Sequence, residues 1–166
     1  MIEPQRPHPL LGVPAEAVME RISKMIEGSA FTGLVLPLLK EFRPSGDFLA
    51  PKMDFFFIVT EGLLNPNRTL HGGAIATIVD ELTSMHLTAH ILEGSVSVDL
   101  HVAYHSGAAA GDSIRLESHV LRTGKRVCFT EAKLYRVKDG ALIATALHTK
   151  AVVPASKGVL LMSPKL

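Results

Sequence analysis

One stretch of the chain, residues 65–92, joins a polar turn to a pair of glycines and a long apolar helix pattern. It reads NPNRTLHGGAIATIVDELTSMHLTAHIL. Asn65-Pro66-Asn67 has the composition of a turn, because proline fixes φ and asparagine side chains bond to nearby backbone. The apolar residues that follow recur at spacings of three and four, which is the pattern of a buried helical face. They are Ile75, Ile78, Val79, Leu82, Met85, Ala89 and Leu92. The stretch therefore predicts a loop leading into a buried helix that runs to about Leu92.

Gly72 and Gly73 stand where this helix is expected to begin. A helix start leaves backbone N–H groups unpaired at the positive end of the helix dipole, and glycine lets a ligand approach them closely. Asp80 is the unusual residue inside the helix, since aspartate has poor interior helix propensity. Two interpretations of Asp80 are open: a residue of the solvated helix face beside Glu81 and Ser84, or a functional carboxylate.

Asn65, His71, Gly72, Gly73 and Asp80, in this order and at this spacing, resemble the signature of hotdog-fold acyl-CoA thioesterases. The branch is the one of the bacterial phenylacetyl-CoA thioesterases and the small animal acyl-CoA thioesterases. The similarity extends over residues 52–153, including segments 94–104, 124–130 and 148–150. It implies an enzyme of lipid metabolism that hydrolyses acyl-CoA to a free acid and CoA without metal or cofactor.

The chemistry of thioester hydrolysis assigns roles to two of these residues. The carbonyl oxygen gains negative charge, so an N–H donor must be fixed beside it, and the Gly72 backbone N–H is the candidate. A carboxylate can act on the carbon as general base or as nucleophile, and Asp80 is the candidate for that role.

The resemblance implies further roles for three polar residues. Asn65 matches an amide that holds the thioester or the water, and closing the turn before Pro66 is an equal alternative. His71 matches a histidine before the glycines, and the alternative is a loop residue bonded to backbone. Ser97 matches a serine that supports the attacking water.

Substrate binding is expected at Gly73, and at a basic loop formed by Arg122, Gly124, Lys125 and Arg126. The three positive charges of this loop suit the phosphates of CoA. A solvated hairpin turn explains the same residues equally well.

Secondary-structure patterns precede and follow the central helix. Pro14 suits a helix start, Val18, Ile22, Met25 and Ile26 give that helix an apolar face, and Gly28 or Gly33 can end it. Strands are expected at 34–42, 53–60, 96–104, 114–121, 127–137 and 141–152, with a turn at 44–47. From Val96 to Tyr104 the residues alternate strictly, so this strand should have one apolar and one polar face.

These elements predict an α+β fold, an antiparallel sheet curled around one long helix, with a further helix at the N-terminus. The resemblance identifies this arrangement with the hotdog fold. We expect an N-terminal extension and helix at 1–33, a hotdog thioesterase domain at 34–153 and a C-terminal tail at 154–166.

Composition limits the classes of function. The 166 residues carry a net charge of +1, which gives no nucleic-acid footprint, and no apolar run is long enough to span a membrane. Cys128 is the single cysteine, which fits a reducing compartment inside the cell. We expect a cytoplasmic protein, with a peroxisome or a mitochondrion as alternatives. The peroxisome is an alternative because the chain ends in Lys165-Leu166 as peroxisomal signals do, although Pro164 departs from those signals. His86 and His90 are four apart, but they lack the glutamate of a zinc motif, and a surface or core pair is expected.

Gly72 and Asp80 are eight residues apart, which corresponds to roughly 12 Å along one helix. Both must lie near the reacting atoms of one thioester, so the sequence predicts a site shared between two subunits of a homodimer. The resemblance implies that such dimers pair again. One alternative function is non-catalytic binding of an acyl thioester. A hydratase of this fold is disfavoured, because its histidine motif is absent.

Overall fold

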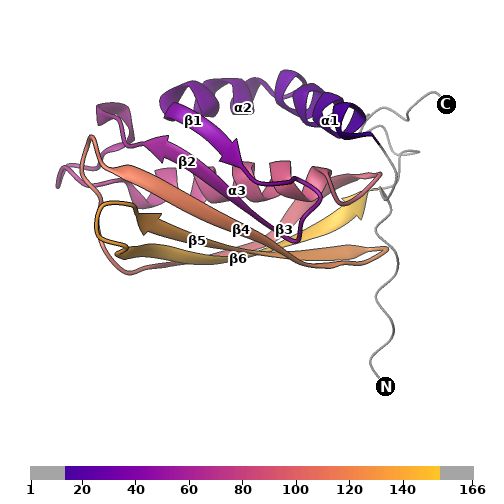
Figure 1. Cartoon of the computed structure of the whole chain (residues 1–166). Helices are drawn as coiled ribbons and strands as arrows, with labels where there is room; N and C mark the ends of the chain where they lie inside the picture. The colour runs from indigo at the N-terminus through magenta and orange to yellow at the C-terminus, as the bar shows by residue number, and fades with distance from the viewer. Residues whose placement is uncertain (1–13, 154–166) are drawn as a thin grey trace.

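The apolar stretch after Gly72 forms α3, Gly72–Thr88, and a sheet curls around it in the computed structural model, which describes residues 14–153 (Figure 1). The strands are β1 Lys40–Ser45, β2 Lys52–Ile58, β3 Gly94–Tyr104, β4 Ser113–Thr123, β5 Val127–Arg136 and β6 Leu142–Val153. They form one six-stranded sheet in the order β1-β2-β4-β5-β6-β3, in which every neighbouring pair is antiparallel. The predicted α+β architecture is confirmed. β3 follows α3 in the chain but lies at an edge of the sheet.

The core fills the space between α3 and the concave face of the sheet. Val79 and Leu82 of α3 are fully buried, as are Phe55, Leu116 and Leu134 of three neighbouring strands. A helix surrounded in this way can be apolar on more than one side, which explains the apolar residues of α3 outside its main stripe.

The N-terminal helices cover the remaining side of α3, away from β5 and β6 (Figure 1). The predicted first helix is α1, Ala15–Glu27, which buries Val18 and Ile22 and ends at Gly28. Arg21 of α1 donates from Nη2 to the carbonyl oxygens of Ile91 at 2.7 Å and Leu92 at 3.1 Å, so α1 is tied to the chain just after α3.

The strand expected at 34–42 is wrong over most of its length. Residues 30–35 form α2, Ala30–Val35, and a 3-10 turn, η1 Leu36–Leu38, follows; β1 begins only at Lys40. Ser29 caps α2 by accepting from the Thr32 N–H at 3.1 Å, a helix signal that the apolar run obscures. β1 also includes Pro44 and Ser45, which were expected in a turn. β1 is an edge strand, where a proline without an N–H is tolerated.

α3 is shorter than its apolar pattern predicts. It ends at Thr88, and Leu92 lies beyond it with 44% of its surface exposed. His86 and His90 are buried, so the core pair is the correct alternative. His86 lies 2.9 Å from the Ser118 hydroxyl through Nδ1 and 2.9 Å from the Ala50 carbonyl oxygen through Nε2.

The strict alternation expected along β3 is interrupted by a bulge. Ser97 pairs with Lys150 and Asp99 pairs with Thr149, which leaves Val98 without a partner in β6. Val98 is 63% exposed, and Val96 is exposed as well. A bulge reverses the facing of the residues on one side of it. The single apolar face predicted for residues 96–104 is therefore wrong at its first two valines.

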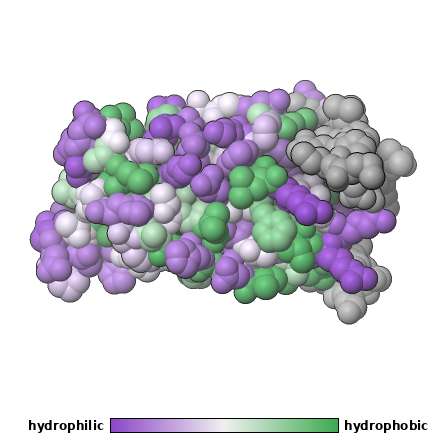
Figure 2. Space-filling model, turned by 90° about the horizontal axis from the view of Figure 1, so that it is seen from below, coloured by the Kyte–Doolittle hydropathy of each residue, from purple (hydrophilic) through white to green (hydrophobic). Residues whose placement is uncertain are grey.

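The convex face of the sheet is mixed in character, with hydrophobic side chains gathered towards its middle among hydrophilic ones (Figure 2). Leu121, Phe129 and Leu147 are the exposed large hydrophobic residues of β4, β5 and β6. None of the helices within residues 14–153 is long and apolar enough to cross a bilayer. The predictions for 1–13, for the tail at 154–166 and for its last three residues lie outside the described residues.

Candidate active site

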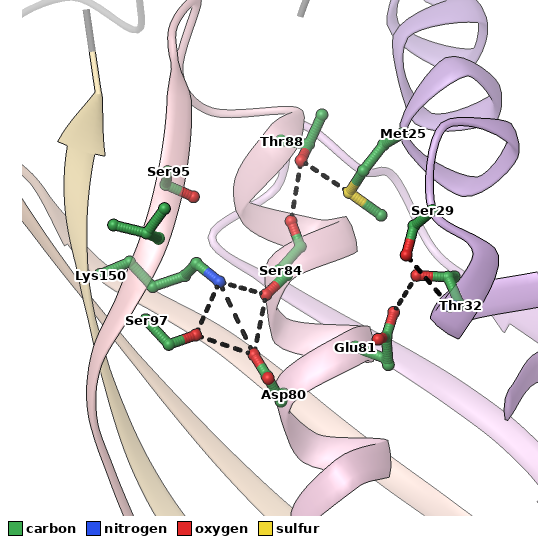
Figure 3. A pocket seen from close by; sticks show the side chains of 11 residues that line it. Met25, Ser29, Thr32, Asp80, Glu81, Ser84, Thr88, Ser95, Ser97 and Lys150 are labelled. Atoms are coloured by element: carbon green, nitrogen blue, oxygen red, sulfur yellow. Dashed lines mark hydrogen bonds and ion pairs between the residues drawn. The ribbon is translucent and has the colours of Figure 1, made fainter. Parts of the chain in front are cut away.

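The Asp80 carboxylate is the centre of a polar cluster between α3, β3 and β6 (Figure 3). Its Oδ1 accepts from Ser97 Oγ at 3.1 Å and from Ser84 Oγ at 3.3 Å. His148 Nε2 lies 3.4 Å and Lys150 Nζ 3.7 Å from the same oxygen. The Asp80 side chain is still 42% exposed, so a ligand can reach it.

Local geometry explains why these side chains meet. Asp80 and Ser84 lie four residues apart on α3, which places them on one side of the helix. His148 and Lys150 alternate along β6 and both face α3, because successive odd-numbered neighbours point the other way. The β3 bulge turns Ser97 to the same face, opposite its partner Lys150.

His148 is a buried, neutral histidine. Burial lowers its pKa to about 4, and the neighbouring Lys150 charge acts in the same direction. A neutral imidazole has one N–H, and Nε2 is the nitrogen that faces Ser97 Oγ at 2.9 Å and the Asp80 carboxylate. Nδ1 lies 2.7 Å from Thr83 Oγ1, whose hydroxyl donates to the Val79 carbonyl oxygen at 2.7 Å, so both ring nitrogens have a polar partner. His148 thus contacts both the Ser97 hydroxyl and the Asp80 carboxylate.

Lys150 brings a positive charge to the same place. Its Nζ donates to Ser84 Oγ at 2.6 Å and to Ser97 Oγ at 3.2 Å, and its side chain is only 6% exposed. Burial lowers the pKa of Lys150, and the Asp80 carboxylate opposes that effect. Both serine hydroxyls accept from the lysine, so they direct their own protons to Asp80.

A cavity of about 320 Å³ opens beside this cluster. Asp80, Ser97 and Lys150 line one part of it, and Glu81 of α3 and Thr32 of α2 line another (Figure 3). The N-terminal helices therefore contribute to the wall of the candidate site.

A second group of predicted residues lies at the start of α3. His71 caps the helix, since its Nδ1 accepts from the Gly73 N–H at 2.8 Å. The Gly72 N–H has no hydrogen-bond partner within residues 14–153, so it is available to a ligand. The Tyr104 hydroxyl donates to the Gly72 carbonyl oxygen at 3.0 Å, and the Tyr104 ring lies 3.3 Å from where a Cβ of residue 72 would be.

Asn65 closes the loop before α3. Its Oδ1 accepts from the N–H groups of Asn67 at 2.9 Å and Thr69 at 3.2 Å, and its Nδ2 donates to Thr69 Oγ1 at 2.9 Å. One N–H of the amide is left over for a ligand. The turn-closing alternative thus describes what the side chain does in this chain, and contact with a thioester remains a prediction.

The Asp80 cluster and the residues at the start of α3 lie at different positions along the contact between α3 and β3. Asp80 lies beside Ser97, whereas Gly72 lies beside Tyr104, seven residues further along β3. One protomer therefore brings Asp80 and Ser97 together, but it does not bring Gly72 to them.

The predicted basic loop is the hairpin between β4 and β5. Its cations, Arg122, Lys125 and Arg126, make no ion pair with any described residue. A Cβ at Gly124 would lie 2.5 Å from the Val127 carbonyl oxygen, so the turn itself requires this glycine. A direct contact between Gly124 and CoA remains a prediction.

Sequence reasoning assigned no role to His148, Lys150 or Ser84. The signal was present in β6, where His148 and Lys150 continue the inward face that begins with Ala144 and Ala146. Two ionisable residues on an inward strand face need polar partners, and Asp80 with its serines provides them. No group of three His, Cys, Asp or Glu side chains within residues 14–153 is arranged to hold a metal ion.

The chain is similar to known proteins in both sequence and fold. Residues 67–143 match the thioesterase superfamily. Human acyl-coenzyme A thioesterase 13 is 43% identical over 94 residues, which span 55% of this chain and 66% of that protein, just under two thirds of its length. The crystal structure of mouse thioesterase superfamily member 2 is 32% identical, with a TM-score of 0.68, and the match covers 84% of this chain and 97% of that one. The zebra fish structure of the same name is 30% identical, with a TM-score of 0.70, and the match covers 85% and 99%. The resemblance to hotdog thioesterases is confirmed, and the chain belongs to the thioesterase superfamily.

Proposed function

We propose that the protein hydrolyses acyl-CoA to a free carboxylic acid and CoA, with Asp80 as general base. The observation that carries the proposal is the Asp80 carboxylate, held by Ser97, Ser84, His148 and Lys150 at the edge of an open cavity. The name of the human relative supports acyl-CoA as the substrate class.

The reaction begins when a water molecule binds between Asp80 and the thioester carbon. Asp80 takes a proton from the water as its oxygen bonds to the carbon, and the Gly72 N–H donates to the carbonyl oxygen as that oxygen becomes negative. The carbon–sulfur bond then breaks, and the proton passes to the CoA thiolate. Lys150 and the hydroxyl of Ser97 hold the carboxylate in place through these steps.

This mechanism places each site between two subunits. Ser97 and Tyr104 mark the positions of Asp80 and Gly72 along β3, and β3 is an exposed edge of the sheet. In a two-fold antiparallel pairing of β3 strands centred on His101, Leu100 of one copy pairs with Val102 of the other, and the bulge at Val98 brings Ser97 opposite Tyr104. Asp80 of one subunit then meets Gly72 of its partner, twice in each dimer.

Further association of such dimers and the mode of CoA binding belong to the same proposal. The exposed Leu121, Phe129 and Leu147 on the convex face supply an apolar contact through which dimers can pair. The unpaired Lys125 and Arg126 supply charges for the CoA phosphates.

The experiment measures CoA release from a panel of acyl-CoAs with a thiol reagent, for the wild-type protein and for Asp80→Asn. We expect release by the wild type and at least a hundredfold slower turnover by the variant. Tight acyl-CoA binding without release by the wild type would instead support a non-catalytic acyl-thioester binding protein.

A single turnover in ¹⁸O-labelled water tests whether Asp80 attacks the carbon directly and forms an acyl anhydride that water opens at the Asp80 carbonyl. With Asp80 as base, the label enters the free acid alone. Label in the Asp80 carboxylate would show that this residue attacks the carbon itself.

A further inference from the structure

The cavity beside Asp80 contains a second carboxylate, Glu81, on the side away from Lys150 (Figure 3). Glu81 Oε2 accepts from Thr32 Oγ1 at 2.7 Å. No lysine, arginine or histidine of residues 14–153 lies within ion-pair distance of Glu81. The thioesterase chemistry proposed above uses Asp80 and leaves Glu81 without a role.

The position of Glu81 is fixed by the N-terminal helices. Ser29 caps α2 through the Thr32 N–H, and the Thr32 side chain is buried, with 3% of its surface exposed. The Thr32 hydroxyl that binds Glu81 is therefore fixed in position by the cap of α2 and by burial. This one hydrogen bond goes to Oε2, and the other carboxylate oxygen, Oε1, has no hydrogen-bond partner within residues 14–153.

The cavity wall around Glu81 is polar. Ser29 and Thr88 add hydroxyl groups to this part of the wall, and Met25 adds a thioether. A plain alkyl chain placed here would remove water from the carboxylate without replacing its hydrogen bonds, which is unfavourable. An acyl group with a hydrogen-bond donor would replace them.

We propose that Glu81, oriented by Thr32, is a specificity-determining residue that selects acyl groups carrying a hydroxyl or ammonium group over alkyl groups of equal length. This inference rests on the proposed function, because the selected group must belong to a substrate that Asp80 hydrolyses. Discrimination arises because a site built to bind a donor leaves its own acceptor unpaired when the donor is missing.

The test compares kcat/KM for four six-carbon thioesters of CoA: hexanoyl, 3-hydroxyhexanoyl, 6-hydroxyhexanoyl and 6-aminohexanoyl. We expect at least one donor-bearing substrate to exceed hexanoyl-CoA by about tenfold or more, the size of a hydrogen bond to a charged group. The two hydroxyl positions report where the donor meets Glu81, and the amino substrate reports whether charge adds to the hydrogen bond.

Glu81→Gln keeps the size of the side chain and removes its charge. We expect this variant to lose most of the preference, through slower hydrolysis of the donor-bearing thioesters and faster hydrolysis of hexanoyl-CoA, while its melting temperature stays close to wild type. Glu117→Gln, the same change on the outer face of β4, is the matched control and should keep the wild-type ratios. Hexanoyl-CoA as the best of the four substrates would overturn the inference, as would a preference that survives in Glu81→Gln.

These outcomes are distinct from failure of the proposed function. A protein that hydrolyses all four thioesters without preference retains the proposed function and loses only the role of Glu81. Absence of CoA release from all thioesters of both panels overturns the proposed function and this inference with it.

Discussion

Ser97 Oγ lies 3.1 Å from Asp80 Oδ1, although regular alternation along β3 would turn Ser97 to the convex face of the sheet. The extra residue, Val98, reverses the facing of the strand between Ser97 and Leu100. Bulges often aim a side chain at a functional site, and here the bulge completes the surroundings of the candidate base. The exposed Val98 is the local cost of that arrangement.

Asp80→Asn should keep the fold and lower kcat by about 10²-fold or more, with a much smaller change in KM. The amide is nearly isosteric and can still accept from Ser97, but it cannot take a proton from water. Lys150 keeps its hydrogen bonds to Ser84 and Ser97, so the melting temperature should fall only modestly. Steady-state kinetics and calorimetry check both effects. A variant that keeps most of its kcat would remove Asp80 from the mechanism.

Gly72→Val should reduce activity more than stability. Gly72 does not have a positive φ, so a side chain there does not strain the backbone. The added atoms would instead meet the Tyr104 ring and cover the free N–H. Gly72→Ala should have the same effect to a smaller degree. An equal loss of activity and melting temperature across the two variants would show that this glycine serves packing alone.

Subunit mixing tests the shared site. Gly72→Val and Asp80→Asn chains, unfolded and refolded together in equal amounts, should regain about a quarter of wild-type activity, because half of the dimers contain one intact site. The control mixes wild-type chains with chains carrying both substitutions. A shared site leaves about a quarter of the activity in this control, whereas a site within one subunit leaves about half. If mixed dimers form in the first mixture but no activity returns, the active site is not shared between subunits.

Lys125→Ala and Arg126→Ala should each raise KM for acyl-CoA by about threefold to tenfold. Each substitution removes a positive side chain that would pair with a phosphate of CoA. Neither change should affect hydrolysis of the matching acyl-N-acetylcysteamine thioester, which has no phosphate. Lys133→Ala, which removes a cation paired with Glu131, is the control and should leave both substrates unaffected. Equal losses on the two substrates would assign the hairpin a structural role instead.

Stability should fall as the pH is lowered from neutrality. Burial lowers the pKa of His86 and of His148 to about 4, below the ordinary value of 6.5. The unfolded chain therefore takes up these protons first, and the stabilisation present above pH 6.5 is lost as the pH falls towards 4. Each histidine should lower the free energy of unfolding by about 2 kcal/mol between pH 7 and pH 5. Urea unfolding of the wild type and of His86→Gln at both pH values measures this, and the variant should show the smaller pH dependence.

The sequence by itself predicted the central helix, the positions of the later strands along the chain and the separation of Gly72 from Asp80. The first two of these features are local, because the apolar spacing of α3 and the residue patterns of the strands are encoded within a few residues. The distance between Gly72 and Asp80 follows from the rise of a helix alone.

Only the tertiary structure decided which side chains surround Asp80. Lys150 lies 70 residues from Asp80 in the sequence, and the pairing of β3 with β6 brings it there. Residues 34–39 have apolar character compatible with strand or helix, and packing of α2 against the rest of the fold selects the helix. The β3 bulge exists because two registers of the same strand pair satisfy different demands: core packing at Leu100 and the polar cluster at Ser97. Long-range pairing sets such a register, and no local pattern in the sequence specifies it.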